Sequence, residues 1–295
     1  MTSGLSTADF EATSTAKRGS VVVGVDYGAA SMSGVDWACA EATSLNAPLH
    51  VVHGWTWPHL APWLTSADRT MRTDLQEAGE RVLSQCRIVA RDAGVATVTS
   101  EVVEGSAGHL LVERSRDAAL VVVGTRRLGP VGRAVLGSTS SAVVASAACP
   151  VLVVHEDLRS AHTTGEVVVG ISGTGSDEAV MRFGLDYAQR HGRALRAVYC
   201  WHGGKARDGQ PAIPSEAEQW LDTSTAPWRA DQAGVTVHLE VRRAHPVEGL
   251  IDAVAPDGVL VVGRHSHRSE HRRHVGSTSL GVLHHMTRPL IVVPA

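Results

Sequence analysis

The sequence predicts an α/β protein built from two tandem, doubly wound domains, each with a five-stranded parallel sheet. Short apolar segments rich in valine alternate along the chain with longer amphipathic segments, a pattern typical of strands joined by crossover helices. In addition, segments of the first half recur in the second half at a nearly constant spacing. A repeat of this length indicates a duplicated domain rather than an array of short repeats.

The duplication is clearest at the start and near the end of each copy. The sequence VVVGVD at 21–26 reappears as VVVGIS at 167–172, which is 146 positions later. The sequence GSTS at 137–140 reappears at 276–279, only 139 positions later. The first copy therefore carries seven additional residues, which we place between its second and third strands.

The repeat divides the chain into a polar N-terminal tail at 1–19, a first domain at 20–156 and a second domain at 166–295. A length of 295 residues is sufficient for two domains of ordinary size. The tail has no apolar core, so we expect it not to act as a secretory signal.

Each predicted strand is a short run of mostly β-branched residues, and each predicted helix is a longer amphipathic stretch. In the first copy we expect strands near 20–26, 48–54, 98–104, 119–124 and 150–155, and helices near 31–45, 67–93, 107–116 and 138–147. In the second copy we expect strands near 166–172, 194–200, 235–242, 258–263 and 288–293. Runs such as LVVV at 120–123 lack polar alternation, so helices should cover both faces of each sheet. Ligands of such sheets bind at the carboxyl ends of the strands, which here are followed by segments 26–31, 54–66 and 124–138.

The composition excludes several classes of protein. The formal net charge is −3, so we expect no strongly basic surface and no nucleic-acid partner. The longest apolar runs are too short to span a bilayer, so no membrane partner is expected. The cysteines are scattered and form no CxxC pair, which favours reduced thiols and a cytoplasmic location. They are Cys39, Cys86, Cys149 and Cys200.

The strongest local signal for a ligand follows the fourth strand of the first copy. Gly124 permits a close backbone approach at the strand end, and Ser138 and Thr139 open a helix whose free N–H groups could face an anion. Arg126 and Arg127 add positive charge before that helix. The alternative is an ordinary glycine-containing connection with a serine N-cap.

Both copies resemble the domain of the universal stress protein family, over nearly all of residues 20–294. The residues that carry the resemblance are the VGVD segment ending at Asp26, His53–Gly54, the loop from Gly124 to Gly137–Ser138, and the CPVLVV segment from Cys149.

In ATP-binding members of that family the loop reads glycine, two residues, glycine, nine residues, glycine, and then serine or threonine. In the first copy Gly124, Gly137 and Ser138 fit this pattern, and Arg127 stands at the second glycine. In the second copy Gly263, Gly276 and Ser277 fit, and a serine stands at the second glycine. The second copy also lacks the acidic residue after its first strand, so the first copy is the better nucleotide candidate.

The resemblance implies an adenine-nucleotide-binding regulator of the stress response, with ATP and Mg²⁺ mainly in the first domain and slow or absent hydrolysis. It assigns the nucleoside to Asp26 and Gly54 and the phosphates to the glycine loop. The expected nucleotide contacts are Gly24, Asp26, Gly54, Gly124, Arg126, Arg127, Gly137, Ser138 and Thr139, with Gly263, Gly276 and Ser277 in the second domain. The alternative is a nucleotide-free scaffold for dimerisation or other interactions.

In the family, the edges of the closing strands pair across a dimer. Here the strands near 150–155 and 288–293 could pair within the chain, which would hide two apolar edges. This interpretation also allows a homodimer of whole chains.

Two further segments leave alternatives open. The segment from Trp55 to Trp63 is either a lid over a purine ring or a loop that packs on the domain. The segment 264–274 holds four histidines and four arginines, which fits a polyanion contact, a solvated loop or a metal site. The histidines of that metal alternative are His265, His267, His271 and His274. We find no Gly-x-Ser-x-Gly, Walker or triad pattern, so no catalytic residue is predicted.

Overall fold

The computed structural model is an α/β protein, as the sequence predicts. It describes residues 16–56, 67–127, 134–135, 137–156, 158, 164–202, 211, 214–230, 234–264 and 275–294. The first half contains the strands β1 (Val21–Val25), β2 (Leu49–Trp55), β3 (Val98–Glu104), β4 (Leu120–Arg127), β5 (Ala134–Val135) and β6 (Val151–His155), and the helices α1 (Ala29–Leu45), α2 (Ala67–Asp92), α3 (Ala107–Arg114) and α4 (Ser138–Ser146). The second half contains the strands β7 (Val167–Ile171), β8 (Leu195–Trp201), β9 (Val237–Arg243), β10 (Val259–Gly263) and β11 (Leu290–Val293), and the helices α5 (Asp177–Arg190), α6 (Pro214–Ala230), α7 (Pro246–Ala253) and α8 (Ser277–His285).

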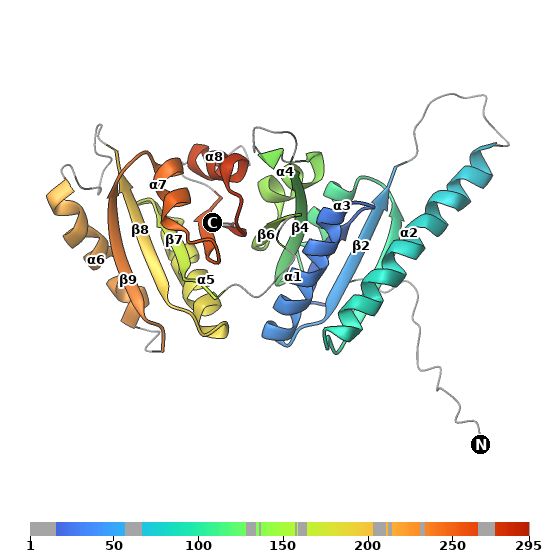
Figure 1. Ribbon diagram of the computed structural model, residues 1–295, viewed down its shortest axis with the longest axis horizontal. Helices are drawn as coiled ribbons and strands as arrows, with labels where there is room; N and C mark the ends of the chain where they lie inside the picture. The colour runs from blue at the N-terminus through green and yellow to red at the C-terminus, as the bar shows by residue number, and fades with distance from the viewer. Residues whose placement is uncertain are drawn as a thin grey trace, which may run out of the picture.

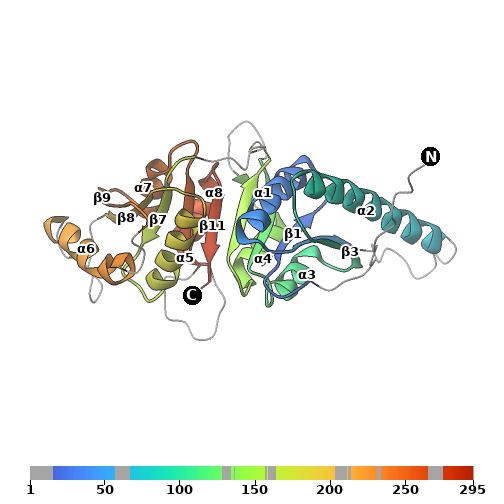
Figure 2. The same ribbon diagram turned by 90° about the horizontal axis from the view of Figure 1, so that it is seen from below.

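Within the described residues, every strand except β5 belongs to one path of pairings that runs through both halves (Figures 1 and 2). The order is β3-β2-β1-β4-β6-β11-β10-β7-β8-β9. Neighbouring strands are parallel inside each half, which confirms the predicted doubly wound fold. The observed strands lie close to the predicted ranges. The main difference is β4, which continues to Arg127 and pairs there with β5, a short strand that the sequence pattern does not indicate.

The two halves join where β6 and β11 pair in antiparallel fashion. Leu152 lies opposite Ile291, and these residues are 139 positions apart, so they are the same position of the repeat. A local two-fold axis therefore passes between them. The expectation that the closing strands pair within the chain is confirmed, and neither strand is left as an open edge.

Two apolar cores lie on the two faces of this sheet, and each core continues from one half into the other. One core lies under α1, α2, α5 and α6, and the other lies under α3, α4, α7 and α8. Figure 1 shows α4 and α8 above the junction of the halves and α1 and α5 below it. Because helices cover both faces, the strands carry the unbroken valine runs that the sequence shows.

A buried polar contact joins α1 to α5 below the junction. Glu41 is only 1% exposed, and Tyr187 donates its hydroxyl to the Glu41 carboxylate at 2.9 Å. His191 lies 3.2 Å from the same carboxylate, and Arg190 donates to the Ser44 hydroxyl at 3.0 Å. Burial, followed by the nearby Glu41 charge, raises the pKa of Tyr187 well above its usual value.

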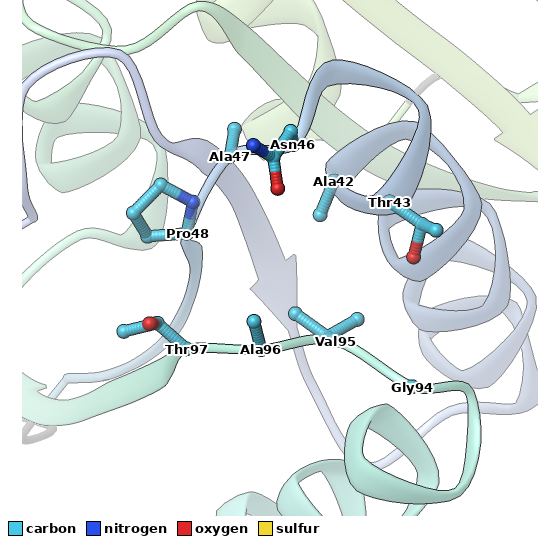
Figure 3. Close-up of a pocket in the computed structure, with 9 residues that line it drawn as sticks. All are labelled: Ala42, Thr43, Asn46, Ala47, Pro48, Gly94, Val95, Ala96 and Thr97. Carbon is cyan, nitrogen blue, oxygen red and sulfur yellow. The ribbon is translucent and has the colours of Figure 1, made fainter.

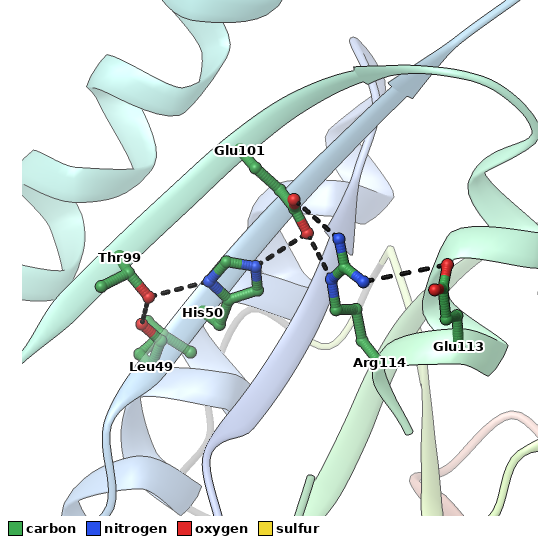
Figure 4. Close-up of polar contacts among 6 residues, drawn as sticks. All are labelled: Leu49, His50, Thr99, Glu101, Glu113 and Arg114. Carbon is green, nitrogen blue, oxygen red and sulfur yellow. Dashed lines mark hydrogen bonds and ion pairs between the residues drawn. The ribbon is translucent and has the colours of Figure 1, made fainter. Parts of the chain in front are cut away.

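A second ionic cluster, formed entirely by residues of the first half, lies near the amino ends of β2 and β3 (Figure 4). Arg114 donates from Nε and Nη2 to the two carboxylate oxygens of Glu101 at 2.7 and 3.0 Å. His50, which is fully buried, places Nε2 at 3.0 Å from Glu101 and Nδ1 at 2.8 Å from the Thr99 hydroxyl. Burial by itself would raise the pKa of Glu101, but the hydrogen bonds from His50 and Arg114 lower it to about 2.

The four cysteines are buried and form no disulfide, as the scattered spacing predicts. Burial raises the pKa of every one of these thiols. The pKa rises to about 12 for Cys39 and Cys149 and to about 11 for Cys86 and Cys200. Among the described segments, the structure contains no helix with the length and apolar character needed to cross a bilayer.

We predict that Leu152→Ala lowers the free energy of unfolding by about 2–5 kcal/mol, because it empties space in the middle of the sheet where the halves meet. Urea unfolding measures this change. Leu280→Ala is the matched control: Leu280 is 41% exposed, so the same truncation should change stability by less than about 0.5 kcal/mol. Equal effects of the two substitutions would contradict the central place of Leu152.

We predict that the stability difference between the wild type and Glu101→Gln depends on pH. The pKa of Glu101 in the folded chain is depressed, so the contribution of its carboxylate is complete above the ordinary glutamate pKa of 4.5 and is lost as the pH falls toward about 2. The difference should shrink by roughly 2 kcal/mol between neutral pH and pH 3, since one pKa unit corresponds to about 1.4 kcal/mol. Urea unfolding at several pH values measures it, and a difference independent of pH would refute the ionic role.

Candidate functional site

The candidate segments of the first half meet at the carboxyl edge of three neighbouring strands. The strand order places β1 between β2 and β4, with Val25 opposite His53 and Gly24 opposite Val123. Asp26 follows β1, Gly54 lies near the end of β2, and the loop to α4 follows β4. The structure therefore brings the predicted segments to one edge. The equivalent edge in the second half is formed by β8, β7 and β10.

Asp26 is an exposed residue whose carboxylate is oriented by its own loop. The Ser31 hydroxyl donates to Asp26 Oδ1 at 2.6 Å, and the Gly28 N–H donates to the same oxygen at 2.7 Å. The Asp26 N–H in turn donates to the Ser31 hydroxyl oxygen at 2.7 Å. These bonds fix a negatively charged acceptor at the strand edge, where hydroxyl or amine donors of a ligand could reach it.

Helix α4 begins at the same edge with a glycine cap rather than a serine cap. Gly137 is the N-cap residue and makes no side-chain cap bond, so the alternative of a serine N-cap is wrong. Gly137 and Ser138 are exposed, and the first N–H groups of a helix have no partner within it. The Ser140 hydroxyl donates to the Gly124 carbonyl oxygen at 3.0 Å, which ties the helix start to the end of β4. The helix start therefore offers N–H groups at a fixed position.

The two candidate arginines of the loop lie in the extension of β4. Arg126 pairs with Val135 and Arg127 pairs with Ala134 in the short antiparallel ladder between β4 and β5. The described part of the chain covers the backbone of these arginines but not their side chains. The position of the family's second glycine, Arg127, is therefore a paired strand residue.

Two of the predicted site glycines, Gly54 and Gly124, lie directly against helix backbone, and a third, Gly24, lies against a leucine side chain. A Cβ atom on Gly24, Gly54 or Gly124 would collide with a neighbouring helix. The atoms that it would meet are Leu111 Cδ1 at 2.5 Å from Gly24, Ala107 Cα at 2.8 Å from Gly54, and the Ala30 carbonyl oxygen at 2.5 Å from Gly124. The close approach that Gly124 permits is thus made by the backbone of α1. By contrast, a Cβ on Gly137 would meet no atom within 4 Å.

In the second half the acid at this edge comes from a residue that the sequence pattern did not single out. Ser172 follows β7, and Asp177, the first residue of α5, lies beneath it and accepts its hydroxyl bond at 2.8 Å. Burial raises the pKa of Asp177, and its hydrogen bonds with the loop oppose that rise. The sequence does hold a signal for this residue. Aligning the two copies at a spacing of 146 places Asp177 at the position of Ser31, where it replaces the acid that the second copy lacks after its first strand.

The glycine loop of the second half keeps the anchors of the first. Gly276 is the N-cap of α8, Ser277 is its first residue, and the Ser279 hydroxyl donates to the Gly263 carbonyl oxygen at 2.6 Å. A Cβ on Gly263 would lie 3.0 Å from the Ser176 hydroxyl oxygen. Both halves therefore use the same serine contact to hold the helix start against the strand end.

Parts of the predicted site lie outside the described residues. The tryptophan-rich segment is described only as far as residue 56, so its two alternatives are not compared. The same holds for residues 265–274, which include the four histidines of the metal alternative.

A shallow groove of about 230 Å³ lies at the opposite edge of the first half (Figure 3). It is lined by residues that precede β2 and β3, among them Asn46, Pro48 and Thr97. None of the residues that line it carries a charge. It is therefore separate from the strand edge that carries Asp26.

The fold and this edge define a class of protein: tandem doubly wound α/β proteins in which a glycine-capped helix starts beside the ends of parallel strands. The chain belongs to the universal stress protein family, because the sequence pattern of that family matches residues 17–155 and 164–294. The class and the predicted family resemblance are both confirmed.

The chain is similar to other universal stress proteins along most of its length. A universal stress protein of Mycolicibacterium smegmatis is 32% identical over 288 residues, which cover 92% of this chain and 96% of that protein. One of Mycobacterium tuberculosis is 31% identical and covers 94% of this chain and 97% of its own. The crystal structure of a universal stress protein from Archaeoglobus fulgidus superposes with a TM-score of 0.71 over 93% of this chain and 98% of that one, at 16% identity. That last similarity supports the shared fold.

We predict that Gly124→Ala lowers the free energy of unfolding by about 1–3 kcal/mol, because its Cβ would overlap the Ala30 carbonyl oxygen. Gly137→Ala is the control, since its Cβ enters open space and its φ of −62° suits any residue. Thermal unfolding compares the two variants. A neutral Gly124→Ala would show that α1 does not press against β4.

Proposed function

We propose that this chain is an adenine-nucleotide-binding universal stress protein that acts as a regulator in the stress response, with ATP held mainly at the strand edge of the first half. The observation that carries the proposal is the exposed, oriented carboxylate of Asp26 on the same edge as the open start of α4. A carboxylate accepts hydrogen bonds from ribose hydroxyls or an adenine amine, and a helix start suits phosphate.

In this proposal Asp26 binds the nucleoside, and the backbone near Gly54 lies beside it. The N–H groups of Gly137, Ser138 and Thr139 bind the phosphates. Mg²⁺ enters with the nucleotide, because this ion is commonly held through phosphate oxygens and retains several waters. The loop from Gly124 to Arg127 completes the phosphate side.

The proposed role is binding rather than turnover. Asp26 is the one acid that we place next to the nucleotide, and it is engaged in orienting the loop. The function would then be a change of state on nucleotide binding, in the cytoplasm, with ATP occupancy as the signal. Two chains associating into a homodimer would be compatible with this role.

A nucleotide-free scaffold is the second candidate function. The observation that favours it is the packing of Gly54 and Gly124 against helix backbone, since both glycines have a structural role even without a ligand. Mass spectrometry of the denatured, freshly purified chain separates the candidates. Co-purified ATP, ADP or AMP supports the first, and a chain free of nucleotide that also gives no signal on titration with Mg·ATP supports the second.

We predict that Gly137→Glu raises the Kd for Mg·ATP by about tenfold or more, because it places a carboxylate where phosphate would bind; tenfold corresponds to about 1.4 kcal/mol. Isothermal titration calorimetry measures the change. Ala148→Glu is the matched control, because it adds the same charge at an exposed position beyond the far end of α4 and should leave the Kd unaltered. If both variants bind as tightly as the wild type, the helix start is not the phosphate site.

A further inference from the structure

The two halves exchange an acid and a hydroxyl at one pair of positions on the strand edge. Asp26 follows β1, and Ser31 lies five residues later in α1. The equivalent positions, each 146 residues later, hold Ser172 and Asp177. The hydroxyl donates to the carboxylate in both halves, at 2.6 Å in the first and 2.8 Å in the second. Each half thus keeps the same polar pair but reverses which residue supplies the carboxylate.

The backbone turn around this pair is common to both halves. The Ser31 N–H donates to the Gly28 carbonyl oxygen at 3.1 Å, and the Asp177 N–H donates to the Thr174 carbonyl oxygen at 3.1 Å. These are equivalent bonds between equivalent positions. The difference between the halves therefore comes from the exchanged side chains and from the residues between them.

The exchange moves the carboxylate from the surface into the protein. Asp26 is exposed, whereas Asp177 is only 6% exposed. The N–H groups of Ser172, Gly173 and Thr174 donate to the Asp177 carboxylate at 3.0, 2.7 and 3.2 Å. Successive N–H groups that converge in this way form an anion-binding nest. In the second half the nest already holds an anion, and that anion belongs to the chain itself.

The residue that follows the first member of each pair also differs between the halves, in a way that matches the buried and exposed carboxylates. Gly173 has a φ of +74°, a conformation that favours glycine and that turns its N–H toward Asp177. Tyr27 stands at the equivalent position of the first half and has no positive φ. There the Gly28 N–H donates outward to Asp26 at 2.7 Å instead. In the second half three loop N–H groups therefore converge on one buried carboxylate, whereas in the first half one loop N–H donates to the buried Ser31 hydroxyl and one to the exposed Asp26 carboxylate.

We propose that the residue at positions 31 and 177 determines which half takes nucleotide: Asp177 closes the second half with an internal carboxylate, and Ser31 keeps the carboxylate of the first half at Asp26, on the exposed side of the edge. The inference rests on the proposed function. It assigns one adenine nucleotide to each chain. Its chemical basis is that Asp177 consumes three loop N–H groups and places negative charge beneath the edge that an anionic nucleotide would approach.

The test is the number of Mg·ATP molecules bound per chain, measured by isothermal titration calorimetry on the full chain. We expect one for the wild type. The double variant Ser172→Asp/Asp177→Ser gives the second half the order of the first without altering net charge, and we expect it to bind two. The reverse exchange, Asp26→Ser/Ser31→Asp, should bind none. Glu178→Ser, an exposed change next to Asp177, is the control and should bind one.

Three results overturn the inference: two nucleotides on the wild type, one nucleotide retained by Asp26→Ser/Ser31→Asp, or one nucleotide on a folded Ser172→Asp/Asp177→Ser. A wild type that binds none overturns the proposed function together with the assignment of sites. Amide hydrogen exchange then tests the closure independently of nucleotide. The N–H groups of 172–174 should exchange about tenfold faster in Asp177→Ser than in the wild type, and unchanged rates would refute the closed loop.

Discussion

The antiparallel pairing of β6 with β11 is the constraint on which the rest of the molecule depends. Leu152 faces Ile291, its own equivalent in the repeat, so the two halves are related by a local two-fold axis. This pairing turns two five-stranded sheets into one sheet and lets both apolar cores run across the junction. It also places α8 against β5, and it allows Arg264 to donate to the Ala147 carbonyl oxygen at the end of α4. Each half thus supports the site edge of the other.

The contacts near this axis differ between the halves in a way that favours pairing within one chain. Glu41 and Tyr187 are equivalent residues and contact each other, and the same is true of Ser44 and Arg190. If two first halves paired in the same manner, two buried Glu41 carboxylates would meet, which is costly without a cationic or donor partner. In the chain as it stands, the carboxylate meets a hydroxyl, and His191 lies close to it. The duplicated halves have therefore become complementary rather than identical.

The sequence was sufficient for the fold because the signals for the fold are local. Uninterrupted valine runs such as the one in β4 indicate strands covered on both faces, and the spacing of 146 and then 139 reveals the duplication without any structure. The candidate segments were also placed correctly at one edge, since the carboxyl ends of neighbouring parallel strands must meet there. The roles of individual residues were not predictable in the same way. What Gly124 makes room for is the Ala30 carbonyl, and this depends on a helix that packs from elsewhere in the fold. The partners of Glu41 lie about one domain away along the chain, so no local sequence pattern predicts them.

The two halves carry the same polar pair in opposite order: Asp26 with Ser31 in the first, and Ser172 with Asp177 in the second. This difference separates what the turn requires from what a ligand would require. Either order satisfies the turn, because one residue always supplies a carboxylate and the other a hydroxyl donor. Both orders occur in the folded chain, the second of them together with Gly173 at a φ of +74°, so the turn itself does not demand one order. A ligand would distinguish the two orders, because only a carboxylate at the position of Asp26 is exposed to solvent. The order of this polar pair is therefore the feature that an anionic ligand at the strand edge would distinguish and that the turn would not.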